Sequence, residues 1–219
     1  MTKVTAIKPL FITLYGYPGA GKTHVARQLA NVLPAAHLHS DRVRRELFSK
    51  PRYDKDENAV VDHMMLYMCE EFLRAGVSVI YDADMNKRAT RRELRNLAHR
   101  SKANSLLVWI QIDAESAYAR LNRRDRRTSD DKFAQTYNRK SFDAVLAHMQ
   151  NPKEEDYIVI SGKHTFNTQR SAIIKKLYEL GAVSIDTTTS HVVKPELVNL
   201  VPSQLAGRVD SNRRNIFIR

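Results

Sequence analysis

Cysteine and long apolar runs are scarce in this sequence, and their scarcity excludes several classes of protein. The single cysteine among 219 residues is Cys69, so no disulfide can form within the chain, which fits a reducing cytoplasm. No stretch approaches the roughly 20 apolar residues that a membrane span needs. The basic N-terminus is not followed by the apolar run and small-residue cleavage site of a secretion signal. We therefore expect a cytoplasmic protein without a membrane partner.

Positive charge, in contrast, is in excess. The chain has 36 Lys and Arg against 24 Asp and Glu, a formal net charge of +12. A field of this sign attracts polyanions such as nucleic acid and phosphorylated metabolites. Charge steers association without specifying the partner, and a solvated basic surface explains the same excess. Nucleic acid is therefore a candidate partner, not an established one.

Apolar patterning predicts alternating strands and helices. Strands are expected at residues 10–15, 36–39, 77–81, 105–112 and 157–160, with a last candidate at 182–185. Helices are expected at 25–33, 40–47, 61–75, 90–102 and 169–180, and one more after Asp113. In the third helix Val61, Met64, Met65, Met68 and Phe72 share one face and are expected in the core, together with Cys69 and Trp109. This alternation predicts an α/β fold in which helices cover both faces of a parallel sheet.

The composition divides the chain into one domain and a tail. We expect a domain at residues 1–186 and a C-terminal extension at 187–219, which contains a candidate edge strand at 215–219 and whose role the sequence does not indicate. Residues 123–136 are charged and poor in large apolar side chains. Such a segment adds little to a core, so we expect it at the surface and mobile.

The strongest motif lies between the first strand and the first helix and reads Gly16-Tyr17-Pro18-Gly19-Ala20-Gly21-Lys22-Thr23. Glycines allow backbone N–H groups to point at phosphate oxygens where a helix begins. The ammonium of Lys22 then reaches the β- and γ-phosphates, and the hydroxyl of Thr23 is placed to coordinate magnesium. These residues, with the adjacent His24, are the predicted site for ATP and Mg²⁺.

A second motif, Ser40-Asp41-Arg42-Val43-Arg44-Arg45, follows the second strand. It is expected at the carboxyl edge of the sheet, where ligands bind in this fold class. The carboxylate of Asp41 has the chemistry of a general base for an attacking hydroxyl, and Arg44 can hold an anionic part of the acceptor. Ser40 or Asp41 acting as a helix cap, with exposed arginines behind it, is the alternative.

A third motif, which contains acidic residues, follows the apolar run 77–81. Asp82 stands where a carboxylate helps to hold magnesium, usually through water. Asp84 and Asn86 are expected to face the same site, although turn formation explains both residue types equally well. Asp113 also ends a strand, but the helix after it makes a capping role the better interpretation.

Arginines crowd the segment after the fourth strand. The members are Arg120, Arg123, Arg124, Arg126 and Arg127. An arginine brought in by a closing segment stabilises the charge that spreads over a transferring phosphoryl group and excludes water. A solvated charge run is the alternative.

In combination these segments resemble the small P-loop kinases that include zeta-toxin-like kinases and the phage-type polynucleotide kinase domain. The resemblance rests on the phosphate loop, residues 40–44, residues 81–88 and residues 120–124, and spans roughly residues 10–181. It implies a five-stranded parallel sheet with the phosphate-loop strand in the middle and an arginine-rich lid at about 123–137.

The resemblance also assigns roles. It implies that Asp41 is the base and that Arg44 binds a substrate phosphate. The lid arginine of the family maps best to Arg124, with Arg120 and Arg123 as neighbours that can share contact with ATP. Asp82 matches the acidic end of the third strand. Asp84 stands where the polynucleotide kinases tend to carry asparagine, so its substrate role is open.

The leading hypothesis is a magnesium-dependent kinase that transfers the γ-phosphate of ATP to a hydroxyl of a small metabolite or nucleoside-type acceptor. The first alternative is a polynucleotide 5′-hydroxyl kinase that uses a basic rim composed of Arg42, Arg44, Arg45, Arg88, Arg91 and Arg92. The second is a non-kinase ATPase switch in which hydrolysis drives a conformational change. The sequence does not name the acceptor.

Overall fold

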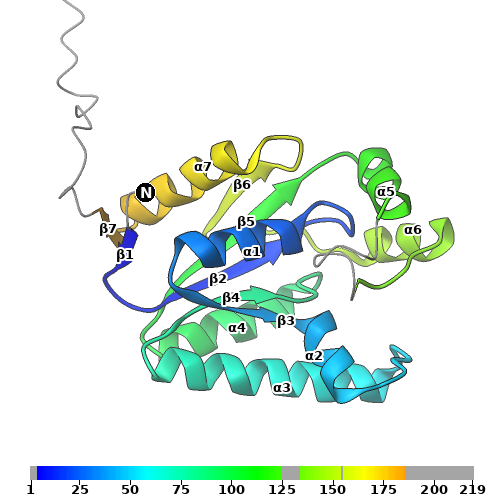
Figure 1. Cartoon of the computed structure of the whole chain (residues 1–219), viewed down its shortest axis with the longest axis horizontal. Helices are drawn as coiled ribbons and strands as arrows, with labels where there is room; N and C mark the ends of the chain where they lie inside the picture. Colours follow the sequence, from blue (N-terminus) through cyan, green and yellow to red (C-terminus); the bar gives the residue numbers. More distant parts are fainter. Residues whose placement is uncertain (1–3, 125–133, 154, 186–219) are drawn as a thin grey trace, which may run out of the picture. The chain divides into compact units, whose positions relative to one another are not determined.

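The computed structural model describes residues 4–124, 134–153 and 155–185, and these belong to one compact unit. Its main sheet has five parallel strands in the order β3-β4-β2-β5-β6 (Figure 1). The strands are β2 (Leu10–Tyr15), β3 (Ala35–His39), β4 (Ser78–Asp82), β5 (Asn104–Gln111) and β6 (Tyr157–Ser161). The predicted α/β class and the central position of the phosphate-loop strand are confirmed.

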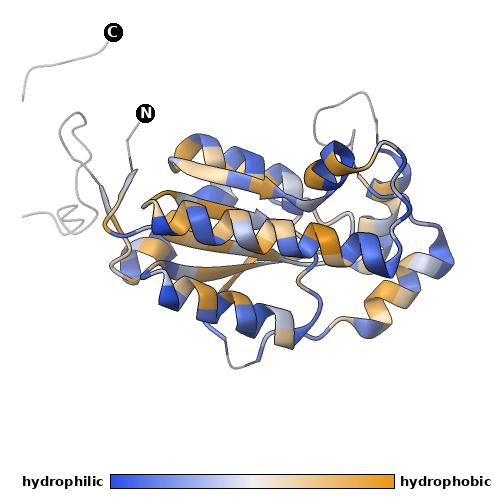
Figure 2. Ribbon diagram, turned by 90° about the horizontal axis from the view of Figure 1, so that it is seen from below, coloured by the Kyte–Doolittle hydropathy of each residue, from blue (hydrophilic) through white to orange (hydrophobic). Residues whose placement is uncertain are grey.

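Helices cover both faces of this sheet because alternate side chains of each strand point to opposite sides. Leu10, Ile12 and Leu14 of β2 are buried against α1 (Lys22–Val32) and α7 (Phe166–Glu179). Phe11 and Tyr15 are buried on the other face, against α3 (Lys55–Arg74) and α4 (Arg88–Arg100). In Figure 2 the central strands are mainly hydrophobic and the flanking helices alternate between polar and apolar residues.

Five shorter elements complete the unit. Helix α2 (Ser40–Leu47) follows β3, and α5 (Ala114–Asn122) and α6 (Arg139–His148) lie beyond the carboxyl ends of the strands (Figure 1). Strands β1 (Val4–Ala6) and β7 (Val183–Ile185) pair antiparallel in a separate two-stranded sheet. The sequence pattern did not predict β1 or α6, because three residues carry no periodicity and α6 buries only Phe142.

The structure corrects two expectations about the helices. Neither Ser40 nor Asp41 caps α2: its N-cap is His39, which makes no side-chain cap hydrogen bond, and Asp41 lies inside the first turn. In α3 the core positions are Val61, Met65, Cys69 and Leu73, whereas Phe72 is 37% exposed. Asp113 does cap α5, because its carboxylate accepts from the backbone N–H of Ser116.

Several expectations fall outside the described residues. They concern the middle of the lid with Arg126 and Arg127, the C-terminal extension at 187–219, and the candidate strand at 215–219. None of the helices that the structure describes is both long enough and apolar enough to cross a membrane.

Candidate active site at the phosphate loop

The phosphate loop connects β2 to α1, and its glycines are required by the backbone. Gly16 has a φ of 147°, and a Cβ at this position would collide with the carbonyl oxygen of Ile110. Gly21, with a φ of 97°, is the left-handed N-cap of α1. The loop therefore lies directly against β5 and presents the first N–H groups of α1 to the space above the sheet, which is an anion-binding geometry.

Lys22 lies over this loop. Its Nζ donates to the carbonyl oxygens of Gly16 at 2.7 Å and Tyr17 at 3.0 Å. Burial lowers the pKa of the Lys22 ammonium, and the carboxylates of Asp82 and Asp84 act in the opposite direction. A bound triphosphate would add negative charge beside the ammonium and stabilise its protonated form.

Asp82 ends β4 beside the loop and is 4% exposed. Its Oδ2 lies 3.2 Å from Nε2 of His37 and 3.9 Å from Nε2 of His39. Burial alone would raise the pKa of Asp82, but hydrogen bonds from His37 and Thr23 and the neighbouring His39 hold it below the ordinary value. Asp82 is therefore a carboxylate at neutral pH, and it accepts a hydrogen bond from the hydroxyl of Thr23.

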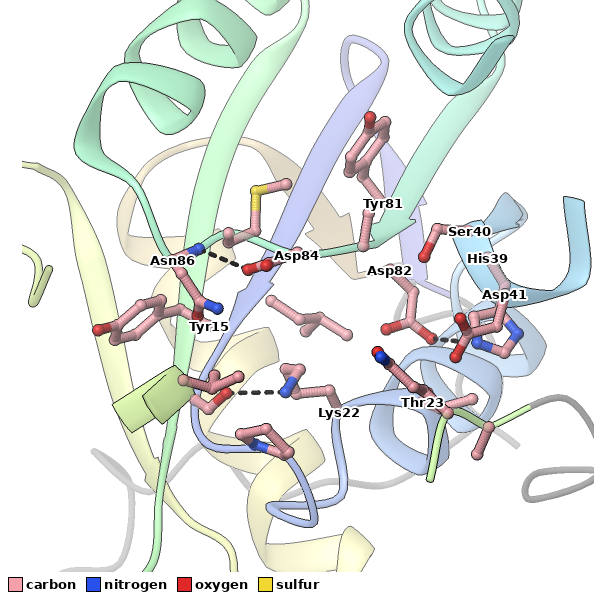
Figure 3. A pocket seen from close by; sticks show the side chains of 18 of the residues that line it. Tyr15, Lys22, Thr23, His39, Ser40, Asp41, Tyr81, Asp82, Asp84 and Asn86 are labelled. Carbon is pink, nitrogen blue, oxygen red and sulfur yellow. Dashed lines mark hydrogen bonds and ion pairs between the residues drawn. The ribbon is translucent and has the colours of Figure 1, made fainter. Parts of the chain in front are cut away.

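Asp41 lies in the first turn of α2, directly after β3, the strand next to the one that carries Asp82. Burial raises the pKa of the Asp41 carboxyl, while His39 and Arg44 and a backbone hydrogen bond from Gln135 oppose that rise. The strand order puts β3 next to β4, and His39 pairs with Asp82 in register. Asp41 and Asp82 thus open into the same space as Lys22, from three different elements (Figure 3).

Arg44 also lines this space, but its charge is already paired. The guanidinium donates to Oε1 of Glu57 at 2.6 Å and to Oδ1 of Asn58 at 2.7 Å, and it lies 4.5 Å from the ring centroid of Tyr53. Arg44 is 6% exposed, and its Nε has no hydrogen-bond partner among the described residues. The expected basic rim is wrong at this position.

The expectation of an exposed basic rim is also wrong at Arg91. This residue is 2% exposed, forms a bidentate ion pair with Glu155 and donates to the carbonyl oxygen of Met85. Arg42, Arg45, Arg88 and Arg92 are exposed. The contact with Met85 instead supports the loop after β4, in which the N–H of Asn86 donates to Oδ1 of Asp84 at 2.9 Å. Asp84 and Asn86 both line the space, as the sequence predicts.

The structure separates the crowded arginines. Arg120 and Arg124 line the space above the loop, whereas Arg123 is not among its lining residues. Nη1 of Arg120 donates to the carbonyl oxygen of Gly162, and Nη1 of Arg124 donates to that of Gln135 at 3.4 Å. Arg124 therefore connects α5 to the segment that enters α6.

Together these groups surround a cavity of about 1010 Å³. Of the predicted ATP-binding residues, those that line it are Gly16, Pro18, Gly19, Gly21, Lys22, Thr23, His24, Arg120 and Arg124, whereas Tyr17, Ala20 and Arg123 do not. The sequence reasoning missed several lining residues on the side away from the loop, namely Tyr53, Asp62, Glu93 and Tyr137. They lie on separate elements, so no local spacing marks them as one group.

A model of a family described as an AAA domain matches residues 11–152 of the chain. No curated protein matches the sequence at a significant level. The family match covers β2 to the segment after α6 and thus includes the phosphate loop, Asp41, Asp82 and Arg124.

Several solved structures share the fold at low sequence identity. A sugar kinase from Janibacter sp. HTCC2649 superposes with a TM-score of 0.56 at 16% identity, over 80% of this chain and 95% of the kinase. A gluconokinase from Sinorhizobium meliloti 1021 gives 0.58 at 16% identity, over 78% and 93%. Kti12 from Chaetomium thermophilum, in complex with ADP-AlF3, gives 0.60 at 16% identity, over 80% and 99%. At this identity the comparisons show the fold and leave the acceptor open.

Proposed function

The chain belongs to the AAA domain family and has the P-loop kinase-like fold, and on this premise we propose that it is a magnesium-dependent ATP phosphotransferase. The γ-phosphate of ATP passes to a hydroxyl of a small metabolite or nucleoside-type acceptor. The observation that carries the proposal is the meeting of Lys22, Asp82 and Asp41 at one cavity. A carboxylate on the far side of the phosphate loop has no task in simple phosphate binding, but it is what an incoming hydroxyl requires.

The donor side of the cavity binds the triphosphate. The loop N–H groups cradle the phosphates, and Lys22 neutralises charge at the β- and γ-phosphates. Arg124 and Arg120 stabilise the charge on the transferring group from the side of α5. The contact of Arg124 with Gln135 links this stabilisation to the position of the lid.

The residues present fit a magnesium ion. Thr23 and Asp82 supply two hard oxygen ligands in mutual contact, and no group of three or more His, Cys, Asp or Glu side chains suited to a metal occurs in the described ranges. Mg²⁺ in such sites keeps most of its ligands from phosphate and water, so two protein oxygens are sufficient. When bound, the ion neutralises charge on the phosphates.

Asp41 orients the acceptor hydroxyl and receives its proton. The hydroxyl oxygen attacks the γ-phosphorus, the bond between that phosphorus and the bridging oxygen to the β-phosphate breaks, and ADP leaves with the bonding electrons. Burial raises the pKa of the Asp41 carboxyl, and a carboxylate of raised pKa is a better base than an exposed aspartate.

The paired state of Arg44 favours a small acceptor over a polynucleotide end. A 5′-hydroxyl kinase must hold phosphates of the nucleic acid near the base, and the residues expected to do so included Arg44 and Arg91. Both are buried and paired with glutamates. The sugar kinase and gluconokinase among the structural neighbours support the same choice, and the polynucleotide alternative is an outcome of the test.

The proposal is tested by measuring ADP release with and without acceptors. For a kinase, adding a mixture of hydroxyl-bearing metabolites should raise ADP release about 10-fold or more, because water is excluded from the closed site. Lys22→Ala should abolish the signal, because the variant loses the charge that holds the γ-phosphate. ADP release that is equal with and without acceptors would indicate the ATPase switch instead, and full activity of Lys22→Ala would remove the loop from the mechanism.

A further inference from the structure

Two histidines of β3 have no task in the function proposed above. His37 and His39 point to the same face of this strand, because side chains two residues apart in a strand share a face. Ala35 lies on that face too and packs against the core beneath α1. The side chains of His37 and His39 are 15% and 11% exposed. A largely buried imidazole costs stability unless its N–H is hydrogen-bonded, so the partner of each ring is informative.

The partner of His37 is Asp82, the carboxylate proposed to serve magnesium. Nε2 of His37 lies 3.2 Å from Oδ2 of Asp82. Because Asp82 is ionised and can only accept, this nitrogen carries the hydrogen of the bond. His39 pairs with Asp82 in the register of β3 and β4, and its Nε2 lies 3.9 Å from the same oxygen (Figure 3). The two imidazoles stack with their centroids 5.7 Å apart. Both rings therefore lie on the Oδ2 side of the carboxylate.

This bond restricts the orientation of a carboxylate at the end of a strand. Asp82 is the last residue of β4, and it lines the cavity together with Thr23. A carboxylate that accepts one hydrogen bond at an oxygen keeps further lone pairs for a metal ion or a metal-bound water. In metal sites generally, a group that hydrogen-bonds to a ligand orients that ligand, and its loss weakens metal binding about 10-fold to 100-fold.

We infer that His37 is a positioning residue for magnesium, whose Nε2–H holds Asp82 in the orientation that receives the ion. The inference rests on the proposed function and adds a residue to it. His37 does not line the cavity, so it acts through Asp82 and not by contact with the nucleotide or the acceptor.

The position of β3 gives the bond a second consequence. This strand lies at the edge of the sheet and pairs only with β4. Helix α2, which carries Asp41, follows it directly. The hydrogen bond from His37 therefore also connects the strand that leads to the proposed base with the strand that ends at the metal carboxylate.

The experiment measures how much Mg²⁺ tightens the binding of a non-hydrolysable ATP analogue to the full chain. Calorimetric titration gives the Kd in EDTA and the Kd in Mg²⁺, and their ratio is the magnesium gain. His37→Leu removes the N–H at similar side-chain volume and should lower this gain about 10-fold. The Kd in EDTA should stay within about 2-fold, because the phosphate loop then holds the nucleotide alone.

A bond that only stabilises the fold predicts a different result. His37→Leu would then lower the melting temperature and leave the magnesium gain unchanged, and that result would overturn the inference. The matched control is His99→Leu, the same substitution at an exposed position near the end of α4. It should change neither the gain nor the Kd in EDTA.

Two amide variants decide the question if His37→Leu does not fold. His37→Gln places an amide N–H near the position of Nε2 and should keep the gain within about 3-fold of the wild type, whereas the shorter His37→Asn does not reach Oδ2 and should lose about 10-fold. Equal gains in the two variants would contradict a role for the hydrogen bond. A wild-type protein that binds the analogue equally well in EDTA and in Mg²⁺ would instead remove magnesium from the proposed function, and the inference with it.

Discussion

The environment of Asp41 is unusual for an aspartate in the first turn of a helix. Such residues are ordinarily exposed and favourable to the helix dipole. Asp41 instead faces a cavity, next to His39 and close to Asp82, and burial raises the pKa of its carboxyl. It makes no cap hydrogen bond. An ionised group in such a place costs stability, and residues of this kind are often functional.

Asp41→Asn should lower turnover by about 100-fold or more, the usual contribution of a general base, and leave ATP binding nearly intact. The amide keeps the size of the side chain but does not accept the proton of the hydroxyl. The measurement is steady-state kinetics together with calorimetric titration of the nucleotide. Asp56→Asn, at an exposed position in the first turn of α3, serves as the matched control. Unchanged turnover in Asp41→Asn would remove the residue from the mechanism.

The same substitution should make the protein more stable at neutral pH. Because the pKa of Asp41 is raised in the folded state, the native protein binds more protons at this site than the unfolded chain does. Stability then falls as pH rises through the interval between the two pKa values. Asp41→Asn removes this loss, so its melting temperature should exceed that of the wild type at pH 7, and the difference should shrink as pH falls. A lower melting temperature for the variant at pH 7 would show that Asp41 is structural.

At the scale of elements, a buried ion-pair cluster connects α4 to the segment after α6. Glu155 binds Arg91 and Arg95, Arg91 holds the carbonyl oxygen of Met85, and the N–H of Gln150 donates to the carbonyl oxygen of Asn86 at 2.9 Å. Tyr15 of β2 donates to Oδ1 of Asn151 in the same region. The loop that carries Asp84 is therefore supported by the chain that leaves α6.

Glu155→Ala should cost about 3–5 kcal/mol of unfolding free energy, because it leaves the guanidinium of Arg91 buried without its partner. Urea denaturation monitored by circular dichroism measures the loss. Glu179→Ala, which removes an exposed partner of Lys175 on α7, should cost about 0.5 kcal/mol or less. Equal costs for the two variants would mean that the Glu155 cluster does not stabilise the loop.

Local patterns predicted the elements well and the side-chain partners poorly. Period-two and helical spacing located β2 to β6 and most helices. The phosphate loop could be identified because the glycines that let its backbone bind phosphate stand at fixed spacing in the sequence. The burial and ion pairing of Arg44 and Arg91 were not predictable in this way. Each depends on a glutamate 13 or 64 residues away in the sequence, and no local spacing distinguishes a buried, paired arginine from an exposed one.

At the scale of the whole molecule, part of the excess positive charge lies on the exposed surface. A net charge of +12 attracts polyanions to the exposed surface, where Arg42, Arg45, Arg88 and Arg92 lie. The two arginines expected beside the base, Arg44 and Arg91, are instead buried and paired with glutamates. In the proposed function, attraction of polyanions to the surface and phosphate transfer in the cavity are therefore separate properties.

Polyanion binding at the surface and turnover in the cavity should differ in their dependence on salt concentration. Binding of a 5′-hydroxyl oligonucleotide should weaken steeply between about 50 and 200 mM salt, since it releases counterions. Turnover of a small acceptor should change by less than about 3-fold over the same range, because it displaces few counterions and partly buried contacts are screened much less. Turnover that falls as steeply as oligonucleotide binding would favour the polynucleotide alternative.

The central claim is that the γ-phosphate of ATP is transferred to a hydroxyl rather than to water. Its most direct test is to incubate the protein with γ-labelled ATP, Mg²⁺ and an unfractionated mixture of metabolites and RNA ends, and to identify the labelled species by chromatography and mass spectrometry. The expected result is a stable phosphate ester on a small molecule that disappears with Asp41→Asn and Lys22→Ala. Label found solely as inorganic phosphate, at the same rate with and without the mixture, would contradict it.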